Sequence, residues 1–294
     1  MGEGTGERLG ILAGGGSLPC VVARAALEEG YQPIFARFGD GTGGSQDGFG
    51  EGRDFAWGEA GNAIMWLREM QVRRVVFCGT ISRRPDFKAL IPSWQTLKRL
   101  PAALSIVRGG DDRLLRNLAA YLERQGFTLL PVQAVAPQLL TPGGTLSARK
   151  PETLELSALT SARDAAIALG RLDAGQAVVA SNERIIALEG IEGTREMMRR
   201  VADLRARGRI HRGERLALVK AVKPDQDHRF DLPSIGLRTI DEAVEAGISA
   251  IGLSAGASLV LDYDDVVAAA DRAMIALVGL SSAEGTAKAM GDAP

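Results

Sequence analysis

The order of short apolar segments near the N-terminus constrains the fold most. An apolar run precedes a glycine turn, a helix and a second apolar run, at Leu9–Ala13, Gly14–Gly16, Cys20–Glu29 and Gln32–Phe38. Pro19 suits the first turn of the helix, where its missing N–H is harmless. A strand, a glycine turn, a helix and a strand in this order predict the opening of a parallel, Rossmann-like α/β sheet.

The same alternation continues to residue 132. Helical spacing and apolar runs predict further helices and strands, in the order helix Glu59–Glu69, strand Arg74–Cys78, helices Thr96–Ile106 and Arg113–Gln125, and strand Phe127–Val132. Residues 39–54 are glycine-rich and polar, which predicts a surface loop or a poorly ordered insert.

A Pro-Gly-Gly stretch at Thr141–Thr145 is the clearest break in the chain. We expect a Rossmann-like domain at 8–140, a linker at 141–152, a second α/β domain at 153–282, and disordered tails at 1–7 and 283–294. The second domain is predicted to contain helix Thr153–Leu169, a hairpin of Ala177–Ala180 and Ile185–Glu189, helix Arg195–Arg207, strand Leu216–Val219, helix Thr239–Ala246 capped by Thr239, a strand pair of Ala250–Leu253 and Leu259–Asp262, and helix Asp264–Ile275.

Composition excludes several classes of protein. The net charge of −1 and the aromatic content of 5% argue against a nucleic-acid partner. No apolar run is long enough to span a bilayer, and the first residues lack the apolar region of a signal peptide. Cys20 and Cys78 are too few for a metal cluster or a disulfide framework, so we expect buried thiols and a cytoplasmic protein.

The most charged stretch is Lys220–Gly236, which follows an apolar run and contains two lysines and three aspartates. Lysines neutralise phosphate, and Asp225, Asp227 or Asp231 offers a carboxylate for a divalent metal or a water. A strand that ends in such a loop places these charges where α/β proteins have their sites. A solvated loop is the alternative, and for a charge run alone it is the more frequent one.

Two glycine turns are further candidates. Gly15 and Gly16 follow the first strand, and Gly79 and Thr80 follow the third, so both turns are expected at the carboxyl edge of the sheet. Glycines there let the backbone approach a phosphate, which Arg83 or Arg84 would bind bidentately. For the first turn, a tight turn without a ligand is as good an interpretation as a phosphate contact. For the second, an ordinary surface loop is as good an interpretation as a phosphate site.

Known catalytic motifs are otherwise lacking in the sequence. Pro19 replaces the third glycine of a dinucleotide fingerprint, and Arg37 stands where a ribose-binding acid is expected, which disfavours a nicotinamide-dependent oxidoreductase. There is neither a G-x-S-x-G elbow nor an H-E-x-x-H motif, and His211 and His228 are the only histidines. A site of carboxylates and lysines that uses Mg²⁺ and a phosphate-bearing substrate remains.

Six segments, spread in order over residues 8–280, together resemble the UDP-2,3-diacylglucosamine diphosphatase family of lipid A biosynthesis, the two-domain type unrelated to metallophosphoesterases. These segments are Ile11–Pro19, Gly79–Phe87, Gly110–Arg116, Gly170–Gln176, Glu192–Thr194 and Lys220–Gly236. The glycine-rich stretch between Phe38 and Trp57 departs from the family's usual sequence.

The resemblance implies a Mg²⁺-dependent hydrolysis of UDP-2,3-diacylglucosamine to UMP and 2,3-diacylglucosamine 1-phosphate (lipid X), with substrate between a Rossmann-like domain and a family-specific α/β domain. Asp231 is then essential, as a metal ligand or as the group that orients water. The implied substrate-binding residues are Gly15, Gly16, Gly79, Thr80, Arg83, Thr194, Lys220 and Lys223. Asp225 and Asp227 become solvated neighbours.

The acyl chains of such a substrate imply transient contact with the cytoplasmic face of the inner membrane, without an anchor of the protein's own, and we expect a homodimer. The alternative from another class is a non-catalytic carrier of nucleotide sugars or lipids that uses the same pocket. Release of UMP separates the two.

Overall fold

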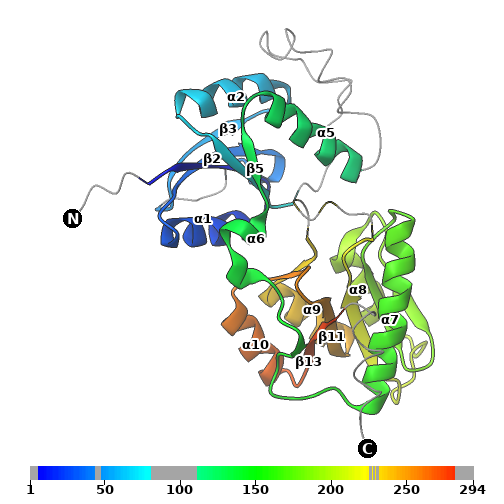
Figure 1. The fold of residues 1–294 in the computed structure, drawn as a ribbon. Helices are drawn as coiled ribbons and strands as arrows, with labels where there is room; N and C mark the ends of the chain where they lie inside the picture. Colours follow the sequence, from blue (N-terminus) through cyan, green and yellow to red (C-terminus); the bar gives the residue numbers. More distant parts are fainter. Residues whose placement is uncertain are drawn as a thin grey trace, which may run out of the picture. The chain divides into compact units, whose positions relative to one another are not determined.

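The structure is a computed structural model that describes residues 6–43, 48–80, 111–224, 227, 229 and 232–281, with the backbone alone at 111–115. The chain divides into two compact units (Figure 1): unit 1 contains residues 1–138 and 227–231, and unit 2 contains residues 139–226 and 232–294. The predicted helix Thr96–Ile106 lies outside the described residues.

Unit 1 is built on a five-stranded parallel sheet of order β3-β2-β1-β4-β5. Its strands are β1 (Arg8–Ala13), β2 (Gln32–Phe38), β3 (Glu51–Phe55), β4 (Arg74–Cys78) and β5 (Thr128–Leu130). Because the chain adds strands first on one side of β1 and then on the other, the strand order reverses between β1 and β4. The predicted Rossmann-like parallel sheet is confirmed.

Helices cover both faces of this sheet, α1 (Leu18–Glu28) on one and α2 (Ala60–Glu69) with α5 (Asp111–Arg124) on the other (Figure 1). Side chains alternate between the faces along each strand. In β2, Ile34 and Ala36 join the core formed with α2 and α5, in which Leu67 is fully buried, while Phe35 is fully buried outside that core. A short helix, α6 (Val132–Val135), follows β5.

The prediction of a surface loop at 39–54 is wrong at its end, since β3 begins at Glu51 and lies at the edge of the sheet. Phe55 is the only buried residue of β3, so the strand lacks the apolar alternation that would have indicated it. Parallel pairing sets Asp54 opposite Arg37, whose guanidinium donates to the Asp54 carboxylate. A polar edge strand of this kind forms by pairing with the neighbouring strand, and not by burying an apolar face.

Unit 2 contains a six-stranded mixed sheet of order β6-β13-β11-β9-β7-β8. These strands are β6 (Gly144–Thr145), β7 (Ala177–Ser181), β8 (Ile185–Leu188), β9 (Leu216–Lys220), β11 (Ile248–Ser254) and β13 (Ala276–Leu280). The three central strands β9, β11 and β13 are parallel, and the remaining three pair antiparallel at the two sides. The predicted hairpin is β7 with β8, and the predicted second α/β region is confirmed.

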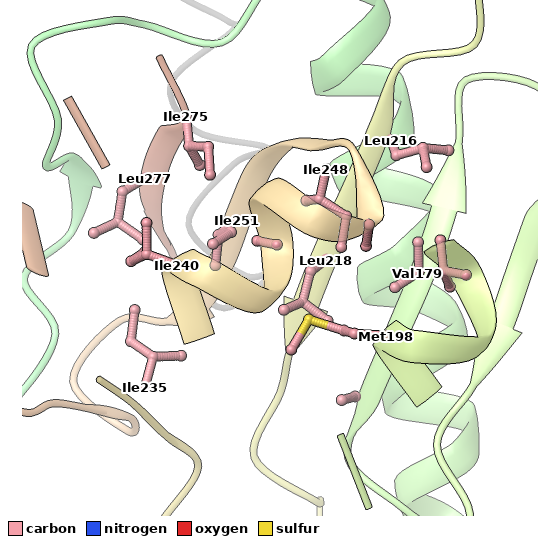
Figure 2. Close-up of a cluster of buried hydrophobic side chains, with 14 of the residues drawn as sticks. Val179, Met198, Leu216, Leu218, Ile235, Ile240, Ile248, Ile251, Ile275 and Leu277 are labelled. Atoms are coloured by element: carbon pink, nitrogen blue, oxygen red, sulfur yellow. The ribbon is translucent and has the colours of Figure 1, made fainter. Parts of the chain in front are cut away.

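One long helix, α7 (Thr153–Arg171), covers one face of this sheet, and α8 (Gly193–Ala206), α9 (Leu237–Ala246) and α10 (Tyr263–Arg272) cover the other. In β9, Leu216 and Leu218 point into the core of the three-helix side, together with Met198 of α8 and Ile240 of α9 (Figure 2). Ala217 and Val219, which alternate with them, pack against α7. The small residues of α7 allow it to approach the sheet closely.

Three predictions for unit 2 are wrong. The segments Ala250–Leu253 and Leu259–Asp262 do not pair with each other, because β11 pairs with β9 and β13, and β12 (Leu259–Val260) pairs with β10 (Ser234–Ile235) in a separate two-stranded sheet. Gly236, not Thr239, is the N-cap of α9. The last helix ends at Arg272, and the chain continues as β13, which the sequence did not predict.

Both cysteines are free thiols, and the prediction that they are buried is confirmed for Cys78 but is wrong for Cys20, which is half-buried. Burial raises the pKa of both thiols, that of Cys78 most, so neither is a thiolate at neutral pH. Within the described ranges, every helix is too short or too polar to traverse a lipid bilayer.

Candidate functional site

The two predicted glycine turns of unit 1 lie side by side at the carboxyl edge of the sheet. Gly14 donates its amide to the Cys78 carbonyl at 2.9 Å, so the turn after β1 is bound to the end of β4. Gly15 and Thr80 then exchange two backbone hydrogen bonds of 2.8 Å each, in the pattern of an antiparallel bridge. This bridge closes the point where the strand order reverses, which is where open α/β sheets bind ligands.

Glycine is required here because backbones approach too closely for side chains. A Cβ built on Gly14 would lie 2.5 Å from the Thr80 carbonyl oxygen, and one built on Gly79 would lie 2.7 Å from the Gly14 carbonyl carbon. Gly79 also has a φ of +98°, in the region that glycine alone adopts without strain. A third turn joins them, since a Cβ on Gly15 would lie 2.6 Å from Cβ of Asp40.

The bridge decides which backbone groups remain for a ligand. The amides of Gly15 and Thr80 donate to each other's carbonyl groups and are therefore used. Cys20 and Val21 donate the first helical bonds of α1, both to the Ser17 carbonyl at 3.1 Å. The amides before Cys20, those of Gly16 to Leu18, donate no bond within the helix and form the positive end of the α1 dipole. An anion at these turns would be bound by Gly16 and the residues after it.

The predicted lysines of unit 2 lie at and just beyond the end of β9. The Lys220 ammonium donates to the Ser234 carbonyl at 2.9 Å, and the Lys223 ammonium pairs with the Asp173 carboxylate at 2.7 Å. Because β9 and β11 are parallel, Ser254 ends its strand at the same edge, and its hydroxyl accepts from the amide of Val222 at 3.1 Å. Lys220, Lys223 and Ser254 therefore stand at, or within three residues of, the ends of two neighbouring strands at one edge of the sheet.

The segment Gly170–Gln176 packs against the residues that follow β9. A Cβ on Gly170, in the last turn of α7, would lie 3.2 Å from Cα of Lys223 and 3.2 Å from Pro224. The backbone carbonyl of Gln176 accepts from the amide of Ala221 at 2.9 Å. The Gln176 side chain leaves its buried oxygen without a hydrogen-bond partner among the described residues. Two of the segments that the sequence singled out are thus in direct contact.

Thr194, predicted to bind substrate, is tied to a buried glutamate that the sequence analysis did not identify. Its hydroxyl donates to Glu189 Oε1 at 2.5 Å. The other oxygen of Glu189 accepts from the amides of Gln176 and Ala177 at 2.9 and 3.0 Å. Glu189 therefore connects the start of α8 to the start of β7, next to Lys220, which pairs with Ala177 in the sheet.

Asp227 and Arg229, in the charged stretch, are grouped with unit 1. The Arg229 guanidinium donates to both carboxylate oxygens of Asp227, at 3.0 Å from Nε to Oδ1 and at 2.8 Å from Nη2 to Oδ2. These hydrogen bonds hold the pKa of Asp227 below its ordinary value. Asp227 is therefore ion-paired, and not a solvated carboxylate.

Several predicted residues lie outside the described residues, namely Arg83, Arg84, Asp225, His228 and Asp231. The roles of Asp231 and Arg83 stay predictions. The described residues with predicted roles form two separate groups: the two glycine turns in unit 1, and Lys220, Lys223 and Thr194 in unit 2. His211 accepts a hydrogen bond from the amide of Gly213 in a surface turn.

The described residues contain no cluster of three or more histidine, cysteine or acidic side chains that would hold a metal ion. Magnesium prefers oxygen ligands, uses only one or two carboxylates and takes its remaining ligands from water and substrate phosphates. Asp231 is the predicted carboxylate and lies outside the described residues, so a role for Mg²⁺ stays a prediction.

Comparison with known proteins shows the family of this chain. The model described as LpxI N-terminal domain matches residues 8–139, and the model described as LpxI C-terminal domain matches residues 142–278. The chain is 39% identical over 281 residues to UDP-2,3-diacylglucosamine pyrophosphatase LpxI from Caulobacter vibrioides, covering 95% of this chain and 99% of that protein.

Similarity to solved structures is slight. The C-terminal domain of the coenzyme A biosynthesis bifunctional protein CoaBC is 14% identical, with a TM-score of 0.25 over 64% of this chain and 84% of that one. The biotin carboxylase domain of a thermophilic 2-oxoglutarate carboxylase bound to ADP is 10% identical, with a TM-score of 0.25 over 71% and 43%. Neither likeness bears on fold or function.

Proposed function

The chain belongs to the LpxI family, and from that premise we propose that it hydrolyses the diphosphate of UDP-2,3-diacylglucosamine. The observation that carries this proposal is the 39% identity to the pyrophosphatase of that name along 95% of the chain. The protein is then a hydrolase of lipid A biosynthesis. The products are UMP and 2,3-diacylglucosamine 1-phosphate, from attack of water on the β-phosphorus.

The two groups of described residues divide the recognition of such a substrate. The glycine turns of unit 1 offer backbone amides at the start of α1, which suit the phosphate groups of the nucleotide. In unit 2, Lys220 supplies a cation at the end of β9, which suits the phosphate on the sugar. Fixed cations and donors lower the barrier because negative charge accumulates on the departing phosphate oxygen.

Magnesium is part of the proposal. When bound, it would neutralise the charge of the diphosphate, and Asp231 would be its ligand or would orient the attacking water. Lys220 holds a phosphate oxygen, Lys223 is held by Asp173 until substrate arrives, and the turns at Gly16 and Gly79 position the nucleotide.

The substrate's two acyl chains place the reaction at a lipid surface. We propose transient contact with the cytoplasmic face of the inner membrane, and a homodimer as the active form. Both proposals rest on the chemistry of the substrate and on the family, and centrifugation with vesicles and light scattering test them.

The test is release of UMP from UDP-2,3-diacylglucosamine by the full chain with Mg²⁺, followed by chromatography. Asp231→Ala should lower the rate by at least about a hundredfold, the scale of losing one group that acts in the transition state. Asp241→Ala is the matched control, because Asp241 is an exposed residue of α9.

The outcomes separate the hydrolase from the carrier. Binding of the nucleotide sugar without UMP release favours the carrier. Full activity of Asp231→Ala removes Asp231 from the mechanism. If Asp231 is a metal ligand, Asp231→Asn also shifts the Mg²⁺ midpoint, whereas a water-orienting role leaves the midpoint unchanged and lowers turnover.

A further inference from the structure

A buried carboxylate of unit 2, that of Glu189, is fixed at both its backbone and its side chain. The Glu189 amide donates to the Ala177 carbonyl at 3.0 Å, and a Cβ on Gly175 would lie 2.5 Å from the Glu189 carbonyl oxygen. Its side chain accepts from the amides of Gln176 and Ala177 through Oε2, and from the Thr194 hydroxyl through Oε1. Glu189 therefore sets the position of the Thr194 hydroxyl relative to the start of β7.

The hydrogen bond between Thr194 and Glu189 also sets the direction in which the hydroxyl can bind a ligand. A carboxylate accepts hydrogen bonds and donates none, so the proton in the 2.5 Å contact between Thr194 Oγ1 and Glu189 Oε1 comes from Thr194. A threonine hydroxyl has one proton to donate and two lone pairs with which to accept. Among the residues that the structure describes, no group donates to these lone pairs. Toward a ligand, the Thr194 side chain is therefore an acceptor.

An acceptor at this position does not suit a phosphate group. The charged oxygens of a diphosphate are acceptors themselves, so they need donors such as an ammonium or an amide. A hydroxyl or an amide N–H is the complementary partner, and an N-acylated amino sugar supplies both. Thr194 is therefore suited to the sugar part of the proposed substrate and not to its diphosphate.

A second acceptor lies in the other segment that Glu189 holds. The side-chain oxygen of Gln176 is buried and has no hydrogen-bond partner among the described residues, whereas the Gln176 backbone amide donates to Glu189. Buried polar atoms without a partner are rare in folded proteins, and a ligand that donates a hydrogen bond satisfies them. Both segments that Glu189 joins thus offer an acceptor.

We propose that Thr194 accepts a hydrogen bond from a hydroxyl or amide N–H of the acylated sugar, and that Glu189 is the positioning residue that makes Thr194 an acceptor. The proposal rests on the proposed function, which supplies the acylated sugar. Lys220, which pairs with Ala177 in the sheet, is the neighbouring cation for the phosphate on that sugar. Thr194 and Glu189 thereby select the nucleotide sugar over the nucleoside diphosphate alone.

The test is titration calorimetry of the full chain, without Mg²⁺, with UDP-2,3-diacylglucosamine and with UDP, which lacks the sugar. In Glu189→Gln, the side-chain oxygen can still accept from the two amides, but its NH₂ group faces Thr194, whose proton then points to the ligand. This variant should weaken binding of the nucleotide sugar by at least about tenfold, because two donors then face each other, and should leave the affinity for UDP unchanged.

Variants of Thr194 test the same acceptor without a change at Glu189. Thr194→Val, which has a similar shape but no acceptor, should also weaken binding of the nucleotide sugar alone by about tenfold. Thr194→Ser, which keeps the hydroxyl, should bind like the wild type. Thr160→Val is the matched control, because Thr160 is exposed on α7 and its hydroxyl donates to the Leu156 carbonyl. Melting curves show that each variant is folded.

The direction of the change separates the acceptor role from its alternatives. Tighter binding of UDP by Glu189→Gln would mean that Thr194 meets a phosphate, and equal weakening of both ligands would mean that it meets the nucleotide. Either result overturns the proposal. If the wild type neither binds the nucleotide sugar nor releases UMP with Mg²⁺, the proposed function fails, and the acceptor role fails with it. If the wild type does both and Thr194→Val binds equally well, only the acceptor role fails.

Discussion

The two units join the ends of their segments in different ways. In unit 1, glycine backbones meet directly, as in the bridge between Gly15 and Thr80. In unit 2, buried carboxylates join segments, as Glu189 joins Thr194 to β7 and Glu155 binds Arg149. Backbone contact is short and tolerates no added atom, whereas a buried carboxylate tolerates side-chain change only while its partner remains. The two units should therefore fail under different perturbations.

The largest effect is expected from Arg149→Ala in unit 2. The Arg149 guanidinium donates to both oxygens of Glu155, at 2.8 and 3.0 Å, and Glu155 is only 2% exposed. Removal of the guanidinium leaves a buried charge unpaired, which costs about 4 kcal/mol of unfolding free energy. Denaturant unfolding followed by far-ultraviolet circular dichroism measures this loss.

Tryptophan fluorescence assigns the loss to a unit, because all three tryptophans precede residue 139 in the sequence and so report unit 1. Arg149→Ala should leave the fluorescence midpoint near the wild-type value. Arg207→Ala, which breaks an exposed pair with Asp203, is the control and should cost less than about 0.5 kcal/mol. Equal losses of unfolding free energy for Arg149→Ala and Arg207→Ala would contradict the claim that burial makes the Arg149–Glu155 pair more important than an exposed pair.

The next largest effect is expected from Gly79→Ala in unit 1. The added Cβ would meet the Gly14 backbone at 2.7 Å and force alanine into a φ of +98°, so we expect about 3 kcal/mol of destabilisation. Here the fluorescence midpoint should fall. Gly143→Ala is the control in unit 2, because its nearest neighbour would be a Cβ at 3.9 Å. A neutral Gly79→Ala would mean that the two turns do not need their close approach.

The smallest effect is expected from acid, which should destabilise unit 2 before unit 1. Burial tends to raise the pKa of Glu155, but hydrogen bonds from Arg149 and from the Glu152 amide outweigh it, so the folded pKa lies below the ordinary value of 4.5. A lowered carboxylate pKa stabilises the folded state above the unfolded pKa, and this stability is lost as the pH falls through the folded pKa. One such group changes the unfolding free energy by at most about 1.4 kcal/mol per pH unit.

Hydrogen exchange at decreasing pH measures this loss, after correction for the intrinsic exchange rate. Amides of α7 should lose protection as the pH falls below 4.5, before the amides of β1. Glu155→Gln, whose side chain does not titrate, should show a shallower dependence on pH. Loss of protection at the same pH in both units would show that the Glu155 carboxylate does not dominate the pH dependence of stability in unit 2.

Much of the fold was predictable because burial leaves a pattern in the sequence. Leu216–Val219 is apolar throughout and is a central strand, and α7 has helical spacing. β3 escaped prediction because an edge strand needs no apolar face, and Asp54 reads as loop sequence. β12 is two residues long and pairs with a strand that lies inside the charged stretch, so no local pattern reveals its partner.

The candidate site was predictable only in part. Glycines near phosphate-binding positions stand out, and Gly15, Gly79 and Thr80 do come together. The sequence gives no sign that Gly15 and Thr80 consume each other's amides, because hydrogen bonding between distant segments is a tertiary property. Glu189, Asp173 and Glu123 were missed for the same reason: an acidic residue at the surface and one that binds a distant partner look alike in sequence.

The chain does not enter unit 2 once and remain there. It leaves unit 1 after residue 138, contributes residues 227–231 to unit 1, and resumes unit 2 at residue 232. A fragment that stops at residue 138 would therefore lack Arg229, the partner of Glu123. Such a protein is poorly suited to being split at residue 138 into two independently expressed halves.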